Sequence, residues 1–425
     1  MKLDKETVEK RNIVLITLDS VRADHCSFMG YHRETTPTID KMAKKGLYFE
    51  NAIAASVPTA PSMFCSFTGQ YPLIESLNKN SVDWRKEFCA KETLALKLRQ
   101  MGYSTIAVHR HPWASKYFGF DKGFDYFSSL LSDSVKVEKK EKMNRFIRTL
   151  YNILDILTRK GEAVYWESYY EEIIDVIEKA KRPYFLWVFL LDTHWPYLPP
   201  KKYFGSYHLY IDLLYKYWKI GRKKMLHRKK EKIIIDAYDG AIKYADTFIR
   251  RLWKDLESDD PIFIIHSDHG DGFGEHGFYY HIFDNKTALY EELIHVPLVI
   301  YNADIKGKIE KPFSLLSLSS LIIYLAQMGD KPNEFPINIF CNDFVKSEII
   351  LNGNIIVAVR TRRWKFIKSN NNEELYDLKN DPYEQNNVVD EHLDLVREMR
   401  NIVKSHIKHK EEIKKIKTTA SRLKI

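Results

Sequence analysis

The chain has 425 residues, 44% of them hydrophobic and 29% charged, which is the range of globular proteins and excludes wholesale disorder or a membrane-embedded bundle. The four cysteines lie far apart with no CxxC pair, so the sequence signals neither a disulfide framework nor a thiolate metal site, and we expect a reducing compartment. The formal net charge of +9 favours anionic partners.

Continuous apolar runs recur along the first three quarters of the chain. Amphipathic stretches of helical length, such as 38–45 and 93–101, lie between most of these runs. This alternation predicts an α/β fold, in which a mostly parallel central sheet carries helices on both faces. The runs are Ile13–Leu18, Thr105–Val108, Phe185–Leu191, Ile262–Ile265 and Val296–Ile300.

Polar residues directly follow three of these expected strands. Asp19 follows the first, His194 lies just beyond 185–191, and Asp268 and His269 lie just beyond 262–265. Parallel sheets place their ligands beyond the carboxyl ends of the strands. Carboxylates and imidazoles gathered there predict a site for a divalent cation.

The pattern changes near residue 333. Short β-like runs at 348–351, 355–360 and 364–367 are separated by turn residues and predict a small antiparallel sheet, and residues 391–417 predict a closing helix. We therefore expect a catalytic α/β domain over 1–332, with a helical insert at about 130–235, and a small α+β subdomain with a basic helical tail over 333–425.

Two basic segments hold more charge than the molecule's net. Residues 216–232 contain nine Lys or Arg against one Glu, and residues 402–425 contain eight against two. Two interpretations are open for the first segment: a solvated helix face, or a peripheral contact with an anionic membrane. Nucleic acid is less favoured, because the chain has no recognised module for it. The rings that precede the first segment are Tyr203, Phe204, Tyr207, Tyr210, Tyr215, Tyr217 and Trp218.

No secretory or membrane-spanning segment is predicted. The start is charged through Arg11, and the apolar run 13–18 is too short for either purpose. The longer apolar stretch 313–328 contains four serines and predicts a buried helix. We expect a cytoplasmic location, with peripheral association at a membrane surface as the alternative.

Several ordered motifs resemble those of a known family. The matching segments are Asn12–Asp24, Thr36–Asp40, Thr59–Met63, Phe67–Pro72, Asp192–Tyr197, Ser267–Asp271, Gly274–Gly277, Leu289–Glu292, His295–Leu298, Glu374–Leu378 and Asp381–Pro382. Together they are similar to a sulfatase-like member of the alkaline phosphatase superfamily, and this resemblance implies a three-layer α/β/α sandwich and a metal-dependent ester hydrolase or transferase.

The nucleophile motif departs from the sulfatase pattern. Sulfatases have Cys or Ser, then Pro, then Arg, and the first residue becomes formylglycine; here Thr59 and Met63 stand at the two ends of the motif. Threonine at this position resembles the phosphoglycerol and phosphoethanolamine transferases, which implies a phosphothreonine intermediate on a phosphate ester or diester. A sulfuric ester hydrolase is the alternative within the family. A catalytically degenerate protein that keeps its metal is the non-enzyme alternative.

The resemblance also implies roles for the surrounding residues. The first carboxylate pair of the sulfatases is here Asp19-Ser20, which leaves Asp19, Asp268, His269 and the Thr59 oxygen for one divalent metal. This donor set favours Mn²⁺ or Zn²⁺, with Mg²⁺ and Ca²⁺ as alternatives.

Four further residues are expected around the metal. His194 and His281 match positions that contact the ester or its leaving group, while Arg110 and His111 are expected to bind the substrate anion. The substrate is a small, lipid-linked or polymer-linked phosphoester or sulfate ester. The sequence predicts neither its organic part nor the oligomeric state.

Overall fold

We describe a computed structural model of the chain, over residues 10–76, 80–129, 165–205, 208–211, 213, 227–281, 289–328, 336–370 and 372–422. About half of the expected insert, including residues 130–164 and 214–226, lies outside the described residues. The basic segment 216–232 is therefore described only from residue 227 onward, where α9 begins with four exposed cations, Arg228, Lys229, Lys230 and Lys232.

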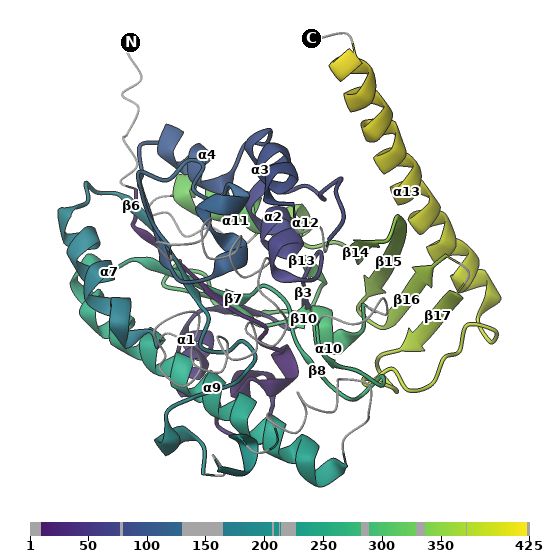
Figure 1. Ribbon diagram of the computed structural model, residues 1–425, viewed down its shortest axis with the longest axis horizontal. Helices are drawn as coiled ribbons and strands as arrows, with labels where there is room; N and C mark the ends of the chain where they lie inside the picture. Colours follow the sequence, from purple (N-terminus) through teal and green to yellow (C-terminus); the bar gives the residue numbers. More distant parts are fainter. Residues whose placement is uncertain are drawn as a thin grey trace, which may run out of the picture.

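The centre of the molecule is an eight-stranded, mostly parallel sheet (Figure 1). Five neighbouring strands, β7, β1, β6, β4 and β5, all run parallel. β11 runs antiparallel to both of its neighbours, β7 and β2. In spatial order the strands are β12 (Gly307–Ile309), β2 (Leu47–Phe49), β11 (Leu298–Tyr301), β7 (Ile262–Ser267), β1 (Ile13–Leu18), β6 (Tyr184–Leu190), β4 (Ser104–His109) and β5 (Tyr126–Ser128).

Helices cover both faces of this sheet. All six residues of β1 are buried, because alternate side chains face opposite layers: Ile13 and Leu15 belong to one core, Val14 and Ile16 to the other. This is the predicted three-layer α/β/α arrangement. The first layer contains α2 (Thr59–Thr68), α3 (Ser81–Cys89), α4 (Leu94–Gln100) and α11 (Leu318–Met328); the second contains α1 (Pro37–Lys45), α7 (Glu167–Lys179) and α9 (Arg228–Asp255).

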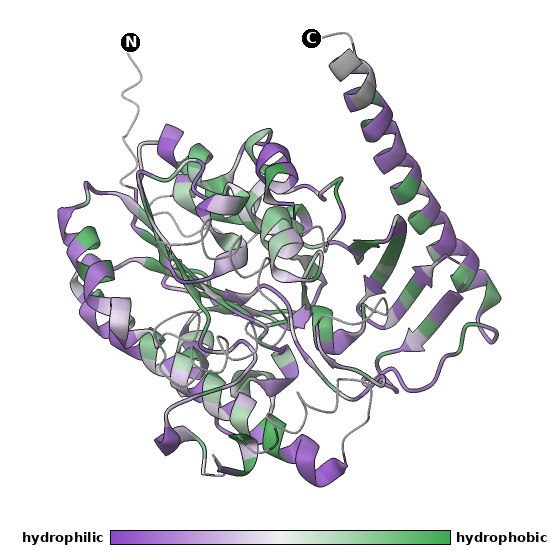
Figure 2. Cartoon of the chain, in the orientation of Figure 1, coloured by the Kyte–Doolittle hydropathy of each residue, from purple (hydrophilic) through white to green (hydrophobic). Residues whose placement is uncertain are grey.

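A separate four-stranded antiparallel sheet confirms the predicted small sheet. Its strands are β14 (Phe344–Leu351), β15 (Asn354–Thr361), β16 (Trp364–Ser369) and β17 (Asn372–Asp377). One face packs on α13 (Leu393–Arg422) through Val357 and Phe366, and the opposite face, with Ala358 and Ile367, continues the core of the first layer. In Figure 2 the side of α13 turned away from the sheet is mainly hydrophilic. The proposed subdomain boundary at 333 falls in 329–335, outside the described residues.

Short elements complete the fold. The expected strand at 296–300 divides between β10 and β11 around Pro297. The expected buried helix at 313–328 begins as a strand, continues as a 3-10 turn over Leu315–Ser317 and becomes α-helical at Leu318. No helix in the described part of the chain is both long and apolar enough to span a membrane. The remaining elements are β3 (Ala52–Ile53), β8 (Gly272–Phe273), β9 (Tyr279–Tyr280), α10 (Glu291–Ile294), β10 (His295–Val296), β13 (Phe313–Ser314) and α12 (Ile337–Phe340).

Candidate active site

Two adjacent strands and one helix bring the four expected metal ligands together. β1 and β7 pair in parallel with Leu18 opposite Ser267, so Asp19 and Asp268 leave the sheet side by side. One ligand atom from each of Asp19, Asp268 and His269 lies within 4.8 Å of the others, and all three residues are buried. Thr59, the first residue of α2, joins them, with Oγ1 3.2 Å from His269 Nε2.

Every carboxylate oxygen of Asp19 and Asp268 except one accepts a hydrogen bond from a neighbouring donor. Asp19 accepts hydrogen bonds from the Ser20 hydroxyl at 2.7 Å and from His111 Nε2 at 2.6 Å. Asp268 Oδ1 accepts the backbone N–H groups of Ser20 and His269, at 3.1 and 2.8 Å. Asp268 Oδ2, in contrast, is buried without a hydrogen-bond partner among the described residues.

Electrostatics make this cluster fit a cation. Burial raises the pKa of Asp268, and the nearby Asp19 carboxylate raises it further. Burial also opposes ionisation of Asp19, but His194 and His111 hold the pKa of Asp19 well below its usual value. Two adjacent buried carboxylates with one unpartnered oxygen are costly unless a positive charge lies between them. The donor set of two carboxylates, one imidazole and one hydroxyl suits a divalent metal.

The tautomer of His269 agrees with this interpretation. Its Nδ1 lies 3.0 Å from the carbonyl oxygen of Gly270, so Nδ1 carries the proton and Nε2 presents its lone pair to the cluster. Burial lowers the pKa of His269, which keeps the ring neutral. A neutral ring with a free lone pair is the form that binds a metal.

His111 and Ser20 support Asp19. His111 Nδ1 accepts the backbone N–H of Trp113 at 3.1 Å, so its proton is on Nε2 and is donated to Asp19. Both ring nitrogens are thereby hydrogen-bonded and the ring orients Asp19, while binding of the substrate anion by His111 stays a prediction. Ser20 stands in the left-handed region, with φ 58°, which lets its N–H and its hydroxyl reach different carboxylates.

His194 and His281 lie beside the cluster, as expected. The ring of His281 is 4.3 Å from that of His269 and 5.5 Å from that of His194, measured between centroids. His281 Nδ1 also lies 2.5 Å from an oxygen of Asp271, whose other oxygen accepts the Tyr197 hydroxyl at 2.5 Å. Sequence reasoning assigned no role to Asp271 or Tyr197, although both lie inside the quoted motifs.

Arg110 has partners other than this cluster. Its guanidinium pairs with Glu172 of α7 at 2.6 Å, bonds to the Ser128 hydroxyl and lies over the ring of Tyr169. Binding of the substrate anion by Arg110 stays a prediction, and it would require the guanidinium to share or leave Glu172.

The expected membrane-facing rings are partly inside the protein. Phe204 and Tyr210 are buried in the second layer, and half-buried Tyr203 packs on Tyr244. Phe204 and Tyr210 are therefore not available to a lipid surface. The other four rings of that set, Tyr207, Tyr215, Tyr217 and Trp218, lie outside the described residues.

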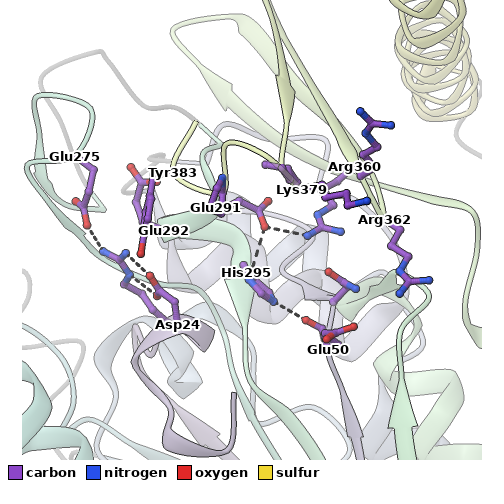
Figure 3. Close-up of a pocket in the computed structure, with 15 residues that line it drawn as sticks. Asp24, Glu50, Glu275, Glu291, Glu292, His295, Arg360, Arg362, Lys379 and Tyr383 are labelled. Carbon is purple, nitrogen blue, oxygen red and sulfur yellow. Dashed lines mark hydrogen bonds and ion pairs between the residues drawn. The ribbon is translucent and has the colours of Figure 1, made fainter. Parts of the chain in front are cut away.

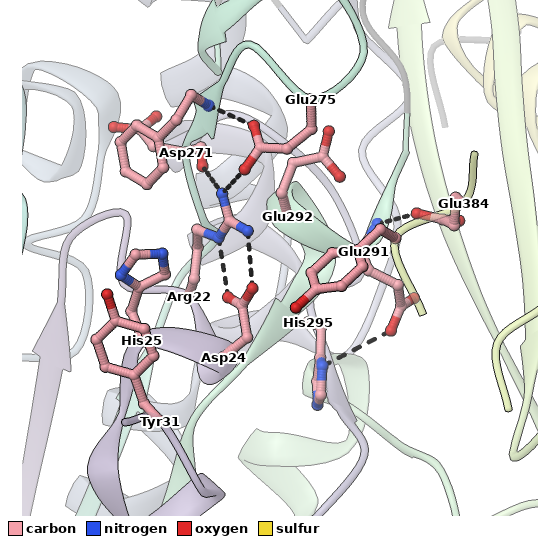
Figure 4. A network of polar contacts seen from close by, with 12 residues as sticks. Arg22, Asp24, His25, Tyr31, Asp271, Glu275, Glu291, Glu292, His295 and Glu384 are labelled. Carbon is pink, nitrogen blue, oxygen red and sulfur yellow. Dashed lines mark hydrogen bonds and ion pairs between the residues drawn. The ribbon is translucent and has the colours of Figure 1, made fainter. Parts of the chain in front are cut away.

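Arg22 locks the loop that carries Asp19. Its guanidinium forms two hydrogen bonds to Asp24, one to Glu275 at 2.5 Å and one to the carbonyl oxygen of Asp271 (Figure 4). Arg22 and Asp24 thus form an ion pair, and Arg22 also holds the loop after β7. His276 serves a loop as well, because it contacts Glu292 and the carbonyl oxygen of Glu384.

A cavity of about 690 Å³ lies between the main body and the small sheet, on the far side of the Arg22 network. Some of its charged groups are paired with one another: Glu291 contacts Arg360 and His295 (Figure 3). None of the four expected metal ligands lines this cavity. The cavity therefore plays no part in the proposed chemistry.

The fold and the site define a class: α/β proteins with a carboxylate–imidazole cluster at the carboxyl edge of a mostly parallel sheet, facing a hydroxyl at a helix N-terminus. A family model described as Sulfatase matches residues 11–326, about three quarters of the chain. The chain belongs to the sulfatase family, a family of hydrolases that normally depend on a metal.

Named relatives and solved structures agree with this assignment. An arylsulfatase of Clostridium perfringens is 25% identical, with 95% of each chain covered. Human iduronate 2-sulfatase is 26% identical over 69% of this chain and 60% of its own. The structure of a phosphonate monoester hydrolase of Agrobacterium radiobacter superposes with a TM-score of 0.70 at 19% identity, covering 94% of this chain and 96% of that one.

Proposed function

We propose that this sulfatase-family protein is a metal-dependent hydrolase or transferase that acts on a phosphate ester or diester through a Thr59 nucleophile. The observation that carries the proposal is the position of the Thr59 hydroxyl, at the first residue of α2 and 3.2 Å from His269 Nε2. The positive end of the helix favours the anionic oxygen that attacks phosphorus.

Asp19, Asp268, His269 and Thr59 would hold the cation, for which we propose Mn²⁺ or Zn²⁺. When bound, such a cation supplies Lewis acidity that lowers the pKa of a nearby hydroxyl. Thr59 then loses its proton to solvent, and Oγ1 forms a bond to phosphorus as the bond to the leaving oxygen breaks. Water or a second alcohol displaces Thr59 from phosphorus in the next step. His194 and His281 serve the leaving or incoming oxygen.

Met63 supports a phosphorus ester over a sulfate ester. It stands where sulfatases have the arginine of the nucleophile motif, and here its side chain is buried in the core of the first layer. A threonine ester of sulfate has no aldehyde hydrate to eject it, so its turnover would be slow. The names of the relatives favour the alternative, a sulfuric ester hydrolase.

The test is a parallel assay with added Mn²⁺ or Zn²⁺ on an aryl phosphate, an aryl phosphodiester, an aryl phosphonate and an aryl sulfate. Thr59→Ala should lower kcat on the phosphorus esters by at least about a thousandfold, because the variant lacks the oxygen that attacks phosphorus. Acid-quenched wild type should carry phosphate on Thr59, detected by mass spectrometry.

Thr68→Ala is the matched control. Thr68 ends the same helix and is also buried, but its hydroxyl bonds only to backbone groups at the far end, the carbonyl oxygens of Phe64 and Gln70 and the N–H of Gln70. Turnover of the sulfate alone would contradict the phosphoester proposal. Metal binding without turnover of any ester, in wild type and variants alike, would favour the degenerate protein.

A further inference from the structure

We propose that Asp271 and Tyr197 are positioning residues that fix His281 as the group donating a proton to the leaving oxygen. The inference rests on the proposed function for its substrate, but it concerns two residues to which the sequence assigned no role. It is carried by a chain of two 2.5 Å contacts, from Tyr197 Oη to Asp271 and from Asp271 to His281 Nδ1.

Both oxygens of Asp271 take part in this chain of hydrogen bonds. It is completely buried, Oδ2 accepts the Tyr197 hydroxyl, and Oδ1 accepts the proton on His281 Nδ1. A buried carboxylate needs such donors to remain charged. Because Nδ1 is occupied by Asp271, Nε2 is the nitrogen of His281 that remains for a substrate.

Tyr197 is held rigidly. Its ring packs edge-on against Tyr238 at 4.9 Å, and its backbone N–H bonds to the Tyr210 hydroxyl. Burial raises the pKa of Tyr197, so the phenol keeps the proton that it donates. A rigid donor on one oxygen leaves Asp271 a single orientation toward His281.

The location of the ring matches the proposed reaction. His281 packs against His269, whose Nε2 contacts the Thr59 hydroxyl. When the bond between phosphorus and the leaving oxygen breaks, its electron pair stays on that oxygen, and the His281 imidazolium transfers its Nε2 proton there. Nδ1–H stays with Asp271. The neutral ring then takes a proton from the water or alcohol that displaces Thr59.

The competing interpretation is a second cation. Ligand atoms of His269, Asp271 and His281 also lie within 4.8 Å of one another. His269 cannot give the same lone pair to two ions, and Nδ1 of His281 faces Asp271 as a donor. We therefore favour the interpretation that Asp271 and Tyr197 position His281 as a proton donor, and the experiments below distinguish it from a second cation.

The first experiment is a leaving-group series: phenyl, nitrophenyl and dinitrophenyl esters of phosphate and, in parallel, of sulfate. Asp271→Asn should lower kcat/KM for the phenyl ester about a hundredfold, the usual size of general acid catalysis, and for the dinitrophenyl ester less than about threefold, because that oxygen leaves without a proton. Tyr197→Phe should show the same dependence on the leaving group with about a tenth of the loss. His281→Gln removes the proton donor itself and should show the largest loss.

Tyr170→Phe is the matched control, since this buried tyrosine also donates to a carboxylate, Asp255 at 2.7 Å, far from the site. It should leave the dependence on the leaving group unchanged. An equal loss across the series for Asp271→Asn would assign it a structural role and overturn the positioning role. Turnover of sulfates alone would refute the proposed function, while the sulfate series still tests the positioning role.

The second measurement needs no turnover. In the Zn²⁺-loaded protein, NMR should show a strongly deshielded Nδ1–H on His281 that Asp271→Asn removes and Tyr170→Phe keeps. Absence of this proton in the wild type would overturn the proposal. So would two equivalents of Zn²⁺ per chain falling to one in Asp271→Asn, because Asp271 and His281 would then hold a cation.

Discussion

The unpartnered oxygen of Asp268 makes a prediction at the scale of one residue. In the metal-free protein this buried oxygen has no donor, so Asp268→Asn should leave the unfolding free energy equal to or above that of the wild type. With Mn²⁺ at a hundred times its Kd, the wild type should gain about 2.7 kcal/mol, and the variant should gain little. Thermal unfolding in EDTA and in Mn²⁺ measures both.

Asp246→Asn is the control for this prediction. Asp246 is equally buried, but its carboxylate accepts backbone N–H groups and lies outside the cluster. Its stability change should be the same with and without the cation. A gain for Asp268→Asn as large as that of the wild type would show that Asp268 does not hold the metal.

The positions of the candidate metal ligands were predictable from the sequence, whereas their hydrogen-bond partners were not. Asp19 and Asp268 follow buried apolar runs, and a parallel sheet puts such residues at one edge. The contacts of His111 with Asp19 and of Asp271 with His281 depend on how loops pack, which no local pattern encodes. Arg110 was expected at the anion because of its charge, but Glu172 lies within reach of it.

At the scale of elements, a carboxylate on α9 fixes the start of α1. Asp246 accepts the N–H of Thr38 at 3.0 and 2.9 Å and that of Ile39 at 3.0 Å, so it satisfies the first turn of α1 from another helix. Burial raises the pKa of Asp246 from 3.8 to about 6, against the opposing effect of these donors.

This pKa predicts an unusual pH dependence. The folded state binds the Asp246 proton more tightly than the unfolded state. The contribution of this proton to the unfolding free energy is therefore complete below about pH 4 and is lost as the pH rises through about 6. The loss is at most about 3 kcal/mol. Relative to Asp246→Asn, the wild type should therefore lose unfolding free energy between pH 4 and 7. Urea titrations at several pH values measure this difference, and a difference that rises with pH would contradict it.

Helices and strands were predicted well where the hydrophobic pattern of a segment fits only one kind of element. The run 13–18 became β1 without change, because a strand buried on both faces is apolar throughout. β17 was missed as a strand, since its sequence, Asn372–Asp377, contains two glutamates that bind Lys368, Arg400 and Tyr290. The antiparallel direction of β11 follows from chain connectivity, which local composition does not encode.

At the scale of the whole molecule, a buried charged triad joins the small sheet and α13 to the main body. Glu348 of β14 contacts His406 at 2.7 Å and Lys410, both from α13. The same residue bonds to the main body through the Ser56 hydroxyl and the carbonyl oxygen of Ala55. Burial lowers the pKa of Lys410, and the Glu348 carboxylate opposes this shift. The side chains of the triad therefore hold α13 to β14, and the backbone of Glu348 bonds β14 to the main body.

This coupling predicts a strongly non-additive double-mutant cycle. Glu348→Met or Lys410→Met alone should each lower the unfolding free energy by about 3–5 kcal/mol, because each strands a buried charge. The double variant should lose much less than the sum, since both charges are gone. Lys417→Met is the control on the same helix: its pair with Glu87, at 3.0 Å, is partly exposed and should be worth less than about 1 kcal/mol. Additive losses in the triad would mean that α13 is held by its apolar face alone, through Val396, Met399 and Val403.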